Sequence, residues 1–256
     1  LAAWMPELQA LGVRWLTVQA ELRRAIPEAF LAPLLQAGIT PIVHIPIHPI
    51  QSLDLDDVRG LLRAYANWGV EHVVVFDRAN MRESWHPGAF EQAQLPERFV
   101  DCWLPLAKAQ MESGLRPVLP PLQQGGTYWD TSFLSAVLRK LISEGAQTVI
   151  DQLVLGVYSY AFANPPDWGR GGNNSWPASQ PYLTPPGSQD QCGFWSFDWY
   201  AEVLMEVVGE IPPMIMLAGG ARRSEIETSS GNRMGTAWHT TCNASIARAM
   251  VAGHLP

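Results

Sequence analysis

Residues 70–85 read VEHVVVFDRANMRESW. The first part, Val70–Phe76, is an apolar, β-branched run that is too short for a helix. Asp77 and Arg78 follow it directly, and Trp85 comes a little later. A continuous apolar run that ends abruptly in polar residues is typical of a parallel strand, buried on both faces, that leads into a functional loop. In α/β barrels this end of the strands carries the chemistry, so we expect functional residues just after this strand.

The rest of the chain alternates between strand-like runs and helical patterns. The expected strands are Val13–Val18, Ile39–Ile45, Val70–Phe76, Leu115–Leu119, Gln152–Tyr158 and Pro213–Leu217. The expected helices are residues 2–10, Pro27–Ala37, Asp54–Asn67, Leu95–Ser113, Asp130–Gly145, Ser196–Gly209 and 237–253. Asp54, ahead of Asp56 and Asp57, has the composition of a helix start. Regular alternation of this kind predicts right-handed βαβ units and a parallel sheet.

Length and composition limit the class of protein. The chain has 256 residues, of which 47% are hydrophobic and 16% charged, and we expect one globular domain over residues 1–256. The net charge of −7 argues against a nucleic-acid partner, because phosphate binding needs a basic surface. The sequence contains no apolar run of about eighteen residues, so it predicts no membrane span. The start, Leu1–Glu7, lacks an initiator methionine, a basic leader and a cleavage site, so we expect a segment of a longer protein.

The cysteines and histidines do not form a metal-binding pattern. Cys102, Cys192 and Cys242 do not form a metal-binding spacing. Cys102 lies in a helical pattern, whereas Cys192 and Cys242 fall in or near loops on the same face, which leaves a disulfide between them open. His44 and His48 have no acidic or cysteine companion close in sequence, so we expect no metal there. Nothing in the sequence predicts a cofactor.

One segment resembles a known family. Phe76–Asn80, FDRAN, followed by Trp85, is similar to the Asn-Glu-Pro-Asn segment that ends strand four of the barrel in clan A retaining glycoside hydrolases, especially their bacterial, cellulase-like relatives. The resemblance implies a (β/α)8 barrel present as an incomplete segment of about strands 2 to 7. Strand one would precede Leu1 and strand eight would follow Pro256. The missing edge would have to come from elsewhere, because exposed parallel edges invite aggregation. A doubly wound open sheet is the alternative, but no glycine-rich nucleotide loop follows the first strand.

The resemblance also places the family's catalytic positions. It puts Arg78 at the general acid/base position and Ala218 at the nucleophile position. A retaining glycosidase needs two carboxyl groups about 5–5.5 Å apart, and neither arginine nor alanine supplies one. We therefore expect no catalytic residue. The alternative is an active hydrolase with displaced carboxylates, Asp77 together with Glu225 or Glu227.

Arg78 also has two interpretations. The first is an ion pair with the neighbouring Asp77 that fills the space of the missing acid. The second is recognition of an anionic sugar by Arg78 together with Arg82 and Arg222, because a guanidinium group matches a carboxylate or sulfate. Tyr158 ends the strand on which the family often carries a residue that orients the nucleophile.

Aromatic residues are frequent around the expected loops, and Ala161–Gly193 is long and irregular. Aromatic faces stack on sugar rings, whereas the alternative is that these residues pack the loops onto the barrel rim. The candidate ligand-binding residues are Arg78, Trp85, Tyr128, Trp129, Tyr158, Tyr160, Trp168 and Trp176.

These observations lead to one main hypothesis. The chain is expected to be a catalytically inactive glycoside-hydrolase-like protein that binds carbohydrate or serves as a structural module of the cell surface. The expected location is extracellular or in the cell envelope. Its expected partners are carbohydrate and, through open sheet edges, further copies of the chain or a larger assembly.

Overall fold

One parallel sheet organises the computed structural model, which describes residues 1, 3–222 and 236–253. Its strands, in the spatial order β1-β2-β3-β4-β5-β6, are β1 (Trp15–Gln19), β2 (Thr40–Ile45), β3 (His72–Val75), β4 (Arg116–Leu119), β5 (Val154–Tyr160) and β6 (Met214–Gly220). All neighbouring strands are parallel. The main helices are α1 (Met5–Ala10), α2 (Glu28–Gln36), α3 (Leu55–Asn67), α4 (Leu95–Glu112), α5 (Asp130–Ser143), α8 (Ser196–Val207) and α10 (Thr236–Val251). The short ones are η1 (Arg82–Ser84), α6 (Gln147–Ile150) and α7 (Gly172–Ser175).

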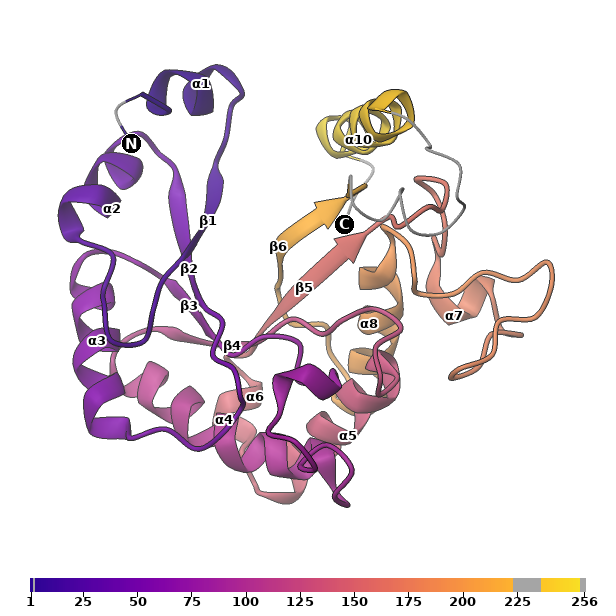
Figure 1. Ribbon diagram of the computed structural model, residues 1–256, viewed down its shortest axis with the longest axis horizontal. Coiled ribbons are helices and arrows are strands. Elements are labelled where there is room, and N and C mark those ends of the chain that lie inside the picture. The colour runs from indigo at the N-terminus through magenta and orange to yellow at the C-terminus, as the bar shows by residue number, and fades with distance from the viewer. Residues whose placement is uncertain (2, 223–235, 254–256) are drawn as a thin grey trace.

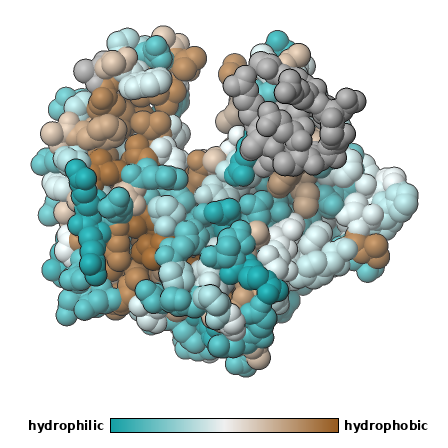
Figure 2. Space-filling view, in the orientation of Figure 1, coloured by the Kyte–Doolittle hydropathy of each residue, from teal (hydrophilic) through white to brown (hydrophobic). Residues whose placement is uncertain are grey.

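The sheet curves strongly and carries its helices on the outer face, as in a (β/α) barrel (Figure 1). Its edge strands β1 and β6 are not paired through their backbones, but the Thr17 hydroxyl on β1 donates to the Leu217 carbonyl on β6 at 3.1 Å. Figure 2 shows a notch between the part that carries β1 and the part that carries α10. The described residues therefore form a partial (β/α) barrel of six strands, as the sequence predicts.

The alternation of side chains along the strands produces two apolar layers. An inner layer fills the concave side of the sheet and contains Ile42, Val74, Val118, Val154 and Leu217. An outer, larger layer packs the sheet against the helices and contains, among others, Val43, Val73, Leu155, Leu62 and Phe99. Full burial of each such side chain stabilises the fold by about 1.5–3 kcal/mol. The inner layer forms the floor beneath the residues described in the next section.

Local sequence signals predicted most element types correctly. Asp54 caps α3, because its carboxylate accepts a hydrogen bond from the Asp56 amide at 3.0 Å. The segment Ala161–Gly193 is irregular apart from the single turn α7.

Four strands have boundaries that differ from the prediction by two or more residues. β1 begins at Trp15 rather than Val13, and β3 begins at His72 rather than Val70. β5 begins two residues later than predicted, because the short helix α6 and a turn occupy the chain before it. β6 continues to Gly220, because Gly219 and Gly220 pair with Ser159 and Tyr160 of β5.

No helix among the described residues is long and apolar enough to cross a membrane. Cys102, Cys192 and Cys242 are free thiols, so the structure does not contain the disulfide that the sequence left open.

Candidate functional site

Polar side chains meet where β2, β3 and β5 end. His44 lies on β2 and His48 follows it, while Asp77 and Arg78 follow β3. Tyr158 lies near the end of β5. We call this group the mouth cluster. Because parallel strands end at one edge of the sheet, these residues are neighbours although up to 114 positions separate them in sequence, counted from His44 to Tyr158.

An unusual backbone course directs Asp77 into the cluster. Phe76 and Arg78, on either side of it, have φ angles of 74° and 44°, in the left-handed region that non-glycine residues rarely adopt. Such a conformation costs roughly 1–3 kcal/mol per residue and is found mainly at functional sites. Two backbone bonds hold it in place: the Phe76 amide donates to the Ile45 carbonyl and the Arg78 amide to the Pro121 carbonyl.

A second set of hydrogen bonds holds the loop just after Arg78. The Asn80 side chain accepts from the Gln123 amide at 2.9 Å and donates to the Gln123 and Tyr128 carbonyls at 2.8 and 2.9 Å. Gly126 packs so closely against Asn80 that an added Cβ would lie 2.3 Å from its side-chain nitrogen. Asn80 therefore joins the loop after β3 to the loop after β4, and any larger residue at Gly126 would disrupt this join.

The Asp77 carboxylate uses both of its oxygens. The Tyr158 hydroxyl donates to Oδ1 at 2.8 Å, and the Arg78 Nε donates to Oδ2 at 2.8 Å. His48 Nε2 lies 3.7 Å from Oδ2. The side chain of Asp77 is only 7% exposed, whereas those of Arg78 and His48 are about one third exposed, at 32% and 33%. The ion pair between Arg78 and Asp77 that the sequence predicts is confirmed.

Burial determines the protonation of the neighbouring groups. It raises the pKa of Tyr158, and the charge of Asp77 and the hydrogen bond to it raise the pKa further. The Tyr158 hydroxyl therefore keeps its proton and acts as a donor. Burial lowers the pKa of His44, so its ring is neutral near pH 7 and donates from Nε2 to the Phe76 carbonyl at 3.1 Å.

Three aromatic side chains continue the cluster along β5 and beyond it. Tyr158, Tyr160 and Phe162 are spaced by two residues, and consecutive ring centroids lie 5.3 and 6.5 Å apart. The Arg222 guanidinium lies over the Tyr160 ring, 3.2 Å from its centroid. A second cation, Arg222, therefore lies at the edge of the mouth cluster, over the ring of Tyr160.

The two positions that the sequence resemblance aligns with catalytic glutamates, Arg78 and Ala218, lie in this region. Arg78 is part of the cluster, and Ala218 on β6 pairs with Tyr158 on β5 and packs against the inner apolar layer. The neighbours that the described part of the chain gives to Asp77 are a phenol, a guanidinium and an imidazole, and none is a carboxyl group. Glu225 and Glu227 lie outside the described residues.

The other predicted ligand-binding residues do not join the mouth cluster. Trp85 is 7% exposed, and its indole donates to the Ala79 carbonyl at 2.8 Å. Tyr128 packs edge-on against Phe133. Both residues fasten loops to the barrel, which favours the packing interpretation for them.

Trp168 and Trp176 shape the long loop after β5. The Trp168 indole donates to the Asp190 carboxylate at 3.0 Å, and the Trp176 indole donates to the Arg170 carbonyl at 3.1 Å. Trp129 differs, because it stands at the start of α5 next to the exposed Tyr182 and lines a groove outside the barrel. Arg82, proposed from sequence as an anion ligand, pairs with Glu91 on the surface.

The described residues contain no group of three histidine, cysteine, aspartate or glutamate side chains placed to hold a metal ion.

Comparisons with known proteins add little. No family model matches the chain, and no curated protein sequence matches it. Among solved structures, it is similar to D-psicose 3-epimerase from Clostridium cellulolyticum H10, with 15% identity, a TM-score of 0.41 and coverage of 84% of this chain and 78% of that one. It is also similar to lysine decarboxylase from Selenomonas ruminantium, with 12% identity, a TM-score of 0.36 and coverage of 87% and 53%. Similarities this weak carry no argument, and the barrel assignment rests on the order and direction of the strands.

Proposed function

We propose that this chain is a glycosidase-type barrel that binds carbohydrate at the mouth cluster without hydrolysing it. The observation that carries the proposal is the state of Asp77, whose two oxygens are occupied by Tyr158 and Arg78. A general acid must release a proton to the substrate, and a nucleophile must present a free oxygen to it. A buried carboxylate held by a guanidinium and a phenol is suited to neither role.

The two positions that the resemblance aligns with catalytic glutamates support the same conclusion. Retaining hydrolysis needs a second carboxyl group about 5–5.5 Å away. Arg78 keeps its proton at any pH at which the protein is folded, and Ala218 provides only a methyl group. The cluster can therefore hold a saccharide but has no pair of carboxyl groups among the described residues with which to cleave it.

The remaining groups suit recognition of a saccharide. Arg78 donates to Asp77 from Nε, and the described residues offer its two terminal nitrogens no hydrogen-bond acceptor. His48 is partly exposed beside it. Guanidinium and imidazole groups donate to sugar hydroxyl or carboxylate oxygens. The proposal includes an extracellular or cell-envelope location, where polysaccharides are available.

The test combines binding with product detection. The protein is incubated with neutral and uronate-containing oligosaccharides, binding is measured by calorimetry, and released products are sought by mass spectrometry. We expect binding without products, and we expect Arg78→Gln to weaken binding about tenfold through loss of charge-assisted hydrogen bonds. Arg116→Gln is the matched control, because Arg116 is an exposed arginine at the opposite end of the barrel, where β4 begins.

Two outcomes would overturn the proposal. Products that disappear in Asp77→Asn would identify a hydrolase with displaced carboxylates, in which Glu225 or Glu227 completes the pair. Equal affinity in Arg78→Gln, Arg116→Gln and the unmodified protein, or no binding at all, would remove the mouth cluster as a saccharide site.

A further inference from the structure

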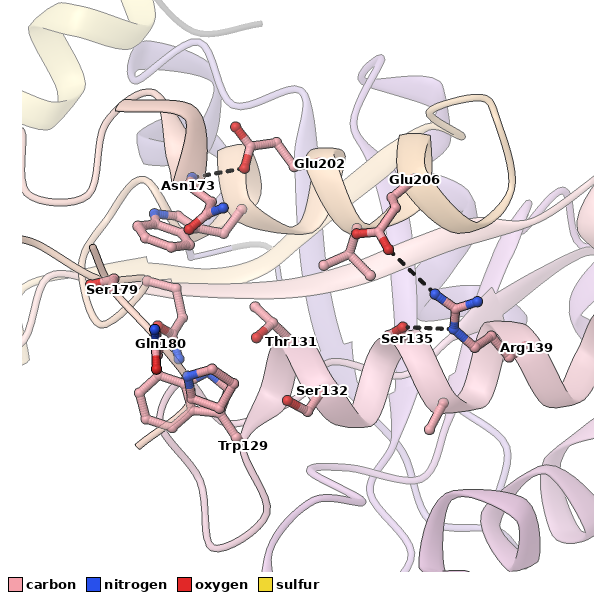
Figure 3. A pocket seen from close by; sticks show the side chains of 15 residues that line it. Trp129, Thr131, Ser132, Ser135, Arg139, Asn173, Ser179, Gln180, Glu202 and Glu206 are labelled. Carbon is pink, nitrogen blue, oxygen red and sulfur yellow. Dashed lines mark hydrogen bonds and ion pairs between the residues drawn. The ribbon is translucent and has the colours of Figure 1, made fainter. Parts of the chain in front are cut away.

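A groove of about 520 Å³ lies outside the barrel between α5, α8 and the loop after β5. Figure 3 shows Thr131, Ser132 and Ser135 along α5 on one side and Glu202 and Glu206 on α8 on the other. Small-molecule sites commonly have volumes of about 300–1,000 Å³, so the groove is large enough for several sugar rings. It is formed by different elements from the mouth cluster and shares no residue with it.

One end of the groove carries a fixed aromatic platform. The rings of Trp129 and Tyr182 lie 5.2 Å apart, and the Trp129 amide donates to the Tyr182 hydroxyl at 2.7 Å. Tyr182 is 64% exposed, so this pair is not held by burial in the core. Trp129 is itself only partly exposed, and a tryptophan that is already held in one orientation binds an apolar ligand face at a low entropic cost.

Unused hydrogen-bonding groups lie next to this platform. The side chains of Thr131, Ser132, Asn173 and Gln180 line the groove and form no hydrogen bond within the part of the chain that the structure describes. They provide hydroxyl and amide groups that can both donate and accept. A polyhydroxylated ligand needs this mixture, because each sugar hydroxyl also both donates and accepts.

The charged residues of the groove are already engaged. Arg139 pairs with Glu206 at 3.3 Å and closes the end away from Trp129 (Figure 3). The Glu202 carboxylate accepts from the Asn173 and Asn174 amides at 2.7 and 3.0 Å. The groove lining thus carries two carboxylates, Glu202 and Glu206, against one guanidinium, Arg139, and this excess of negative charge disfavours an anionic ligand.

We propose that this groove is a second binding site, for a neutral oligosaccharide. One sugar ring stacks on Trp129, and neighbouring hydroxyls bond to Thr131, Ser132, Asn173 and Gln180. Val203 and Ala136 provide an apolar floor. The inference does not rest on the function proposed for the mouth cluster, because the groove binds whether or not the mouth does.

The experiment measures calorimetric binding of cellohexaose, xylohexaose, mannohexaose and maltohexaose, with a galacturonate oligomer as an anionic comparison. At least one neutral probe is expected to bind, and the anionic oligomer is expected not to compete for the groove. Trp129→Ala is expected to weaken that binding about tenfold through loss of stacking, and Thr131→Val about threefold to tenfold through loss of one hydrogen bond. Trp4→Ala is the control, because Trp4 is 65% exposed and lies before α1, far from Trp129 in the sequence.

Three results would overturn the inference. The first is that no neutral probe binds. The second is that Thr131→Val, an almost isosteric change that preserves the fold by circular dichroism, and Trp129→Ala both bind as the unmodified protein does. The third is that Arg78→Gln alone abolishes all binding, which would leave the mouth cluster as the single site.

Discussion

Two buried aspartates in this molecule accept a hydrogen bond from a tyrosine, yet their surroundings differ. Asp77 accepts from Tyr158 at 2.8 Å and is also paired with the Arg78 cation. Asp130, at the start of α5, accepts from Tyr200 at 2.6 Å, and its other partners are the Gln191 side chain at 2.6 Å and the Gly125 amide at 3.1 Å. None of the partners of Asp130 carries a charge.

The difference distinguishes Asp77, in a candidate recognition site, from Asp130, which has a structural role. Asp130 is completely buried, and it joins the loop after β4, the end of the long loop after β5, and α8. Burial raises the pKa of Asp130, although its three hydrogen bonds oppose that effect. Asp77 lies beside two cationic or basic groups that are one third exposed. The carboxylate of Asp77 holds a partly exposed cation, Arg78, which is available for recognition, whereas the carboxylate of Asp130, surrounded by neutral donors, only holds loops together.

The largest expected effect is the loss of stability when Asp130 is replaced. Asp130→Ala removes one acceptor and leaves two buried donors, on Gln191 and Tyr200, without a partner, each at a cost of about 1–3 kcal/mol, together with the partly buried Gly125 amide. We expect the free energy of unfolding to fall by about 3–5 kcal/mol, measured by urea denaturation. The matched control is Asp151→Ala, because Asp151 also accepts from a glutamine side chain, Gln147, but is exposed. Equal losses of unfolding free energy in the two variants would show that the hydrogen bonds of Asp130 do not stabilise the fold.

A smaller effect is expected from the two tyrosines. Tyr200→Phe leaves Asp130 without one of three neutral donors in a fully buried place, at a cost of about 2 kcal/mol. Tyr158→Phe leaves Asp77 with its Arg78 cation near the surface, at a cost of about 1 kcal/mol. Both substitutions remove one hydroxyl and preserve the ring, so each is the control of the other. If Tyr158→Phe were the more costly, the mouth cluster would be the stronger structural element and the comparison would be reversed.

Much of the fold could be predicted from the sequence, because its signals are local. Apolar runs, glycine turns and the Asp54 cap lie within a few residues of the elements that they define. The errors concern strand ends. The ends of β5 and β6 depend on α6 and on the pairing between the two strands. Pairing partners are remote in sequence and leave no local pattern.

The candidate site was predicted less completely for the same reason. The pair of Asp77 and Arg78 is adjacent in sequence and was predicted, whereas the bond from Tyr158 spans 81 positions. The conformation of Phe76 and Arg78 also left no signal, because a left-handed non-glycine residue is imposed by tertiary contacts. Asp130 was predicted only as part of a helix, since Tyr200 lies 70 positions away.

The smallest expected effect is a change in how stability depends on pH. Because the pKa of Asp130 is raised in the folded state, the folded protein holds a proton that the unfolded chain, with an ordinary aspartate, releases above about pH 4. The unfolding free energy that Asp130 contributes is therefore complete at lower pH and falls as pH rises toward the folded pKa. Asp130→Asn is nearly isosteric and cannot ionise, so it lacks this fall.

The measurement is urea denaturation of the unmodified protein and Asp130→Asn at several pH values between 4 and the neutral range. We expect the unmodified protein to lose stability relative to the variant as pH rises. Asp151→Asn is the control for the removal of one carboxylate, because Asp151 is exposed. The opposite slope, with the unmodified protein gaining relative stability, would mean that three neutral donors are enough to hold Asp130 as an anion. In that case the Arg78 cation would not be the feature that distinguishes Asp77 from Asp130. Only the exposed donors of the mouth cluster would then distinguish the two.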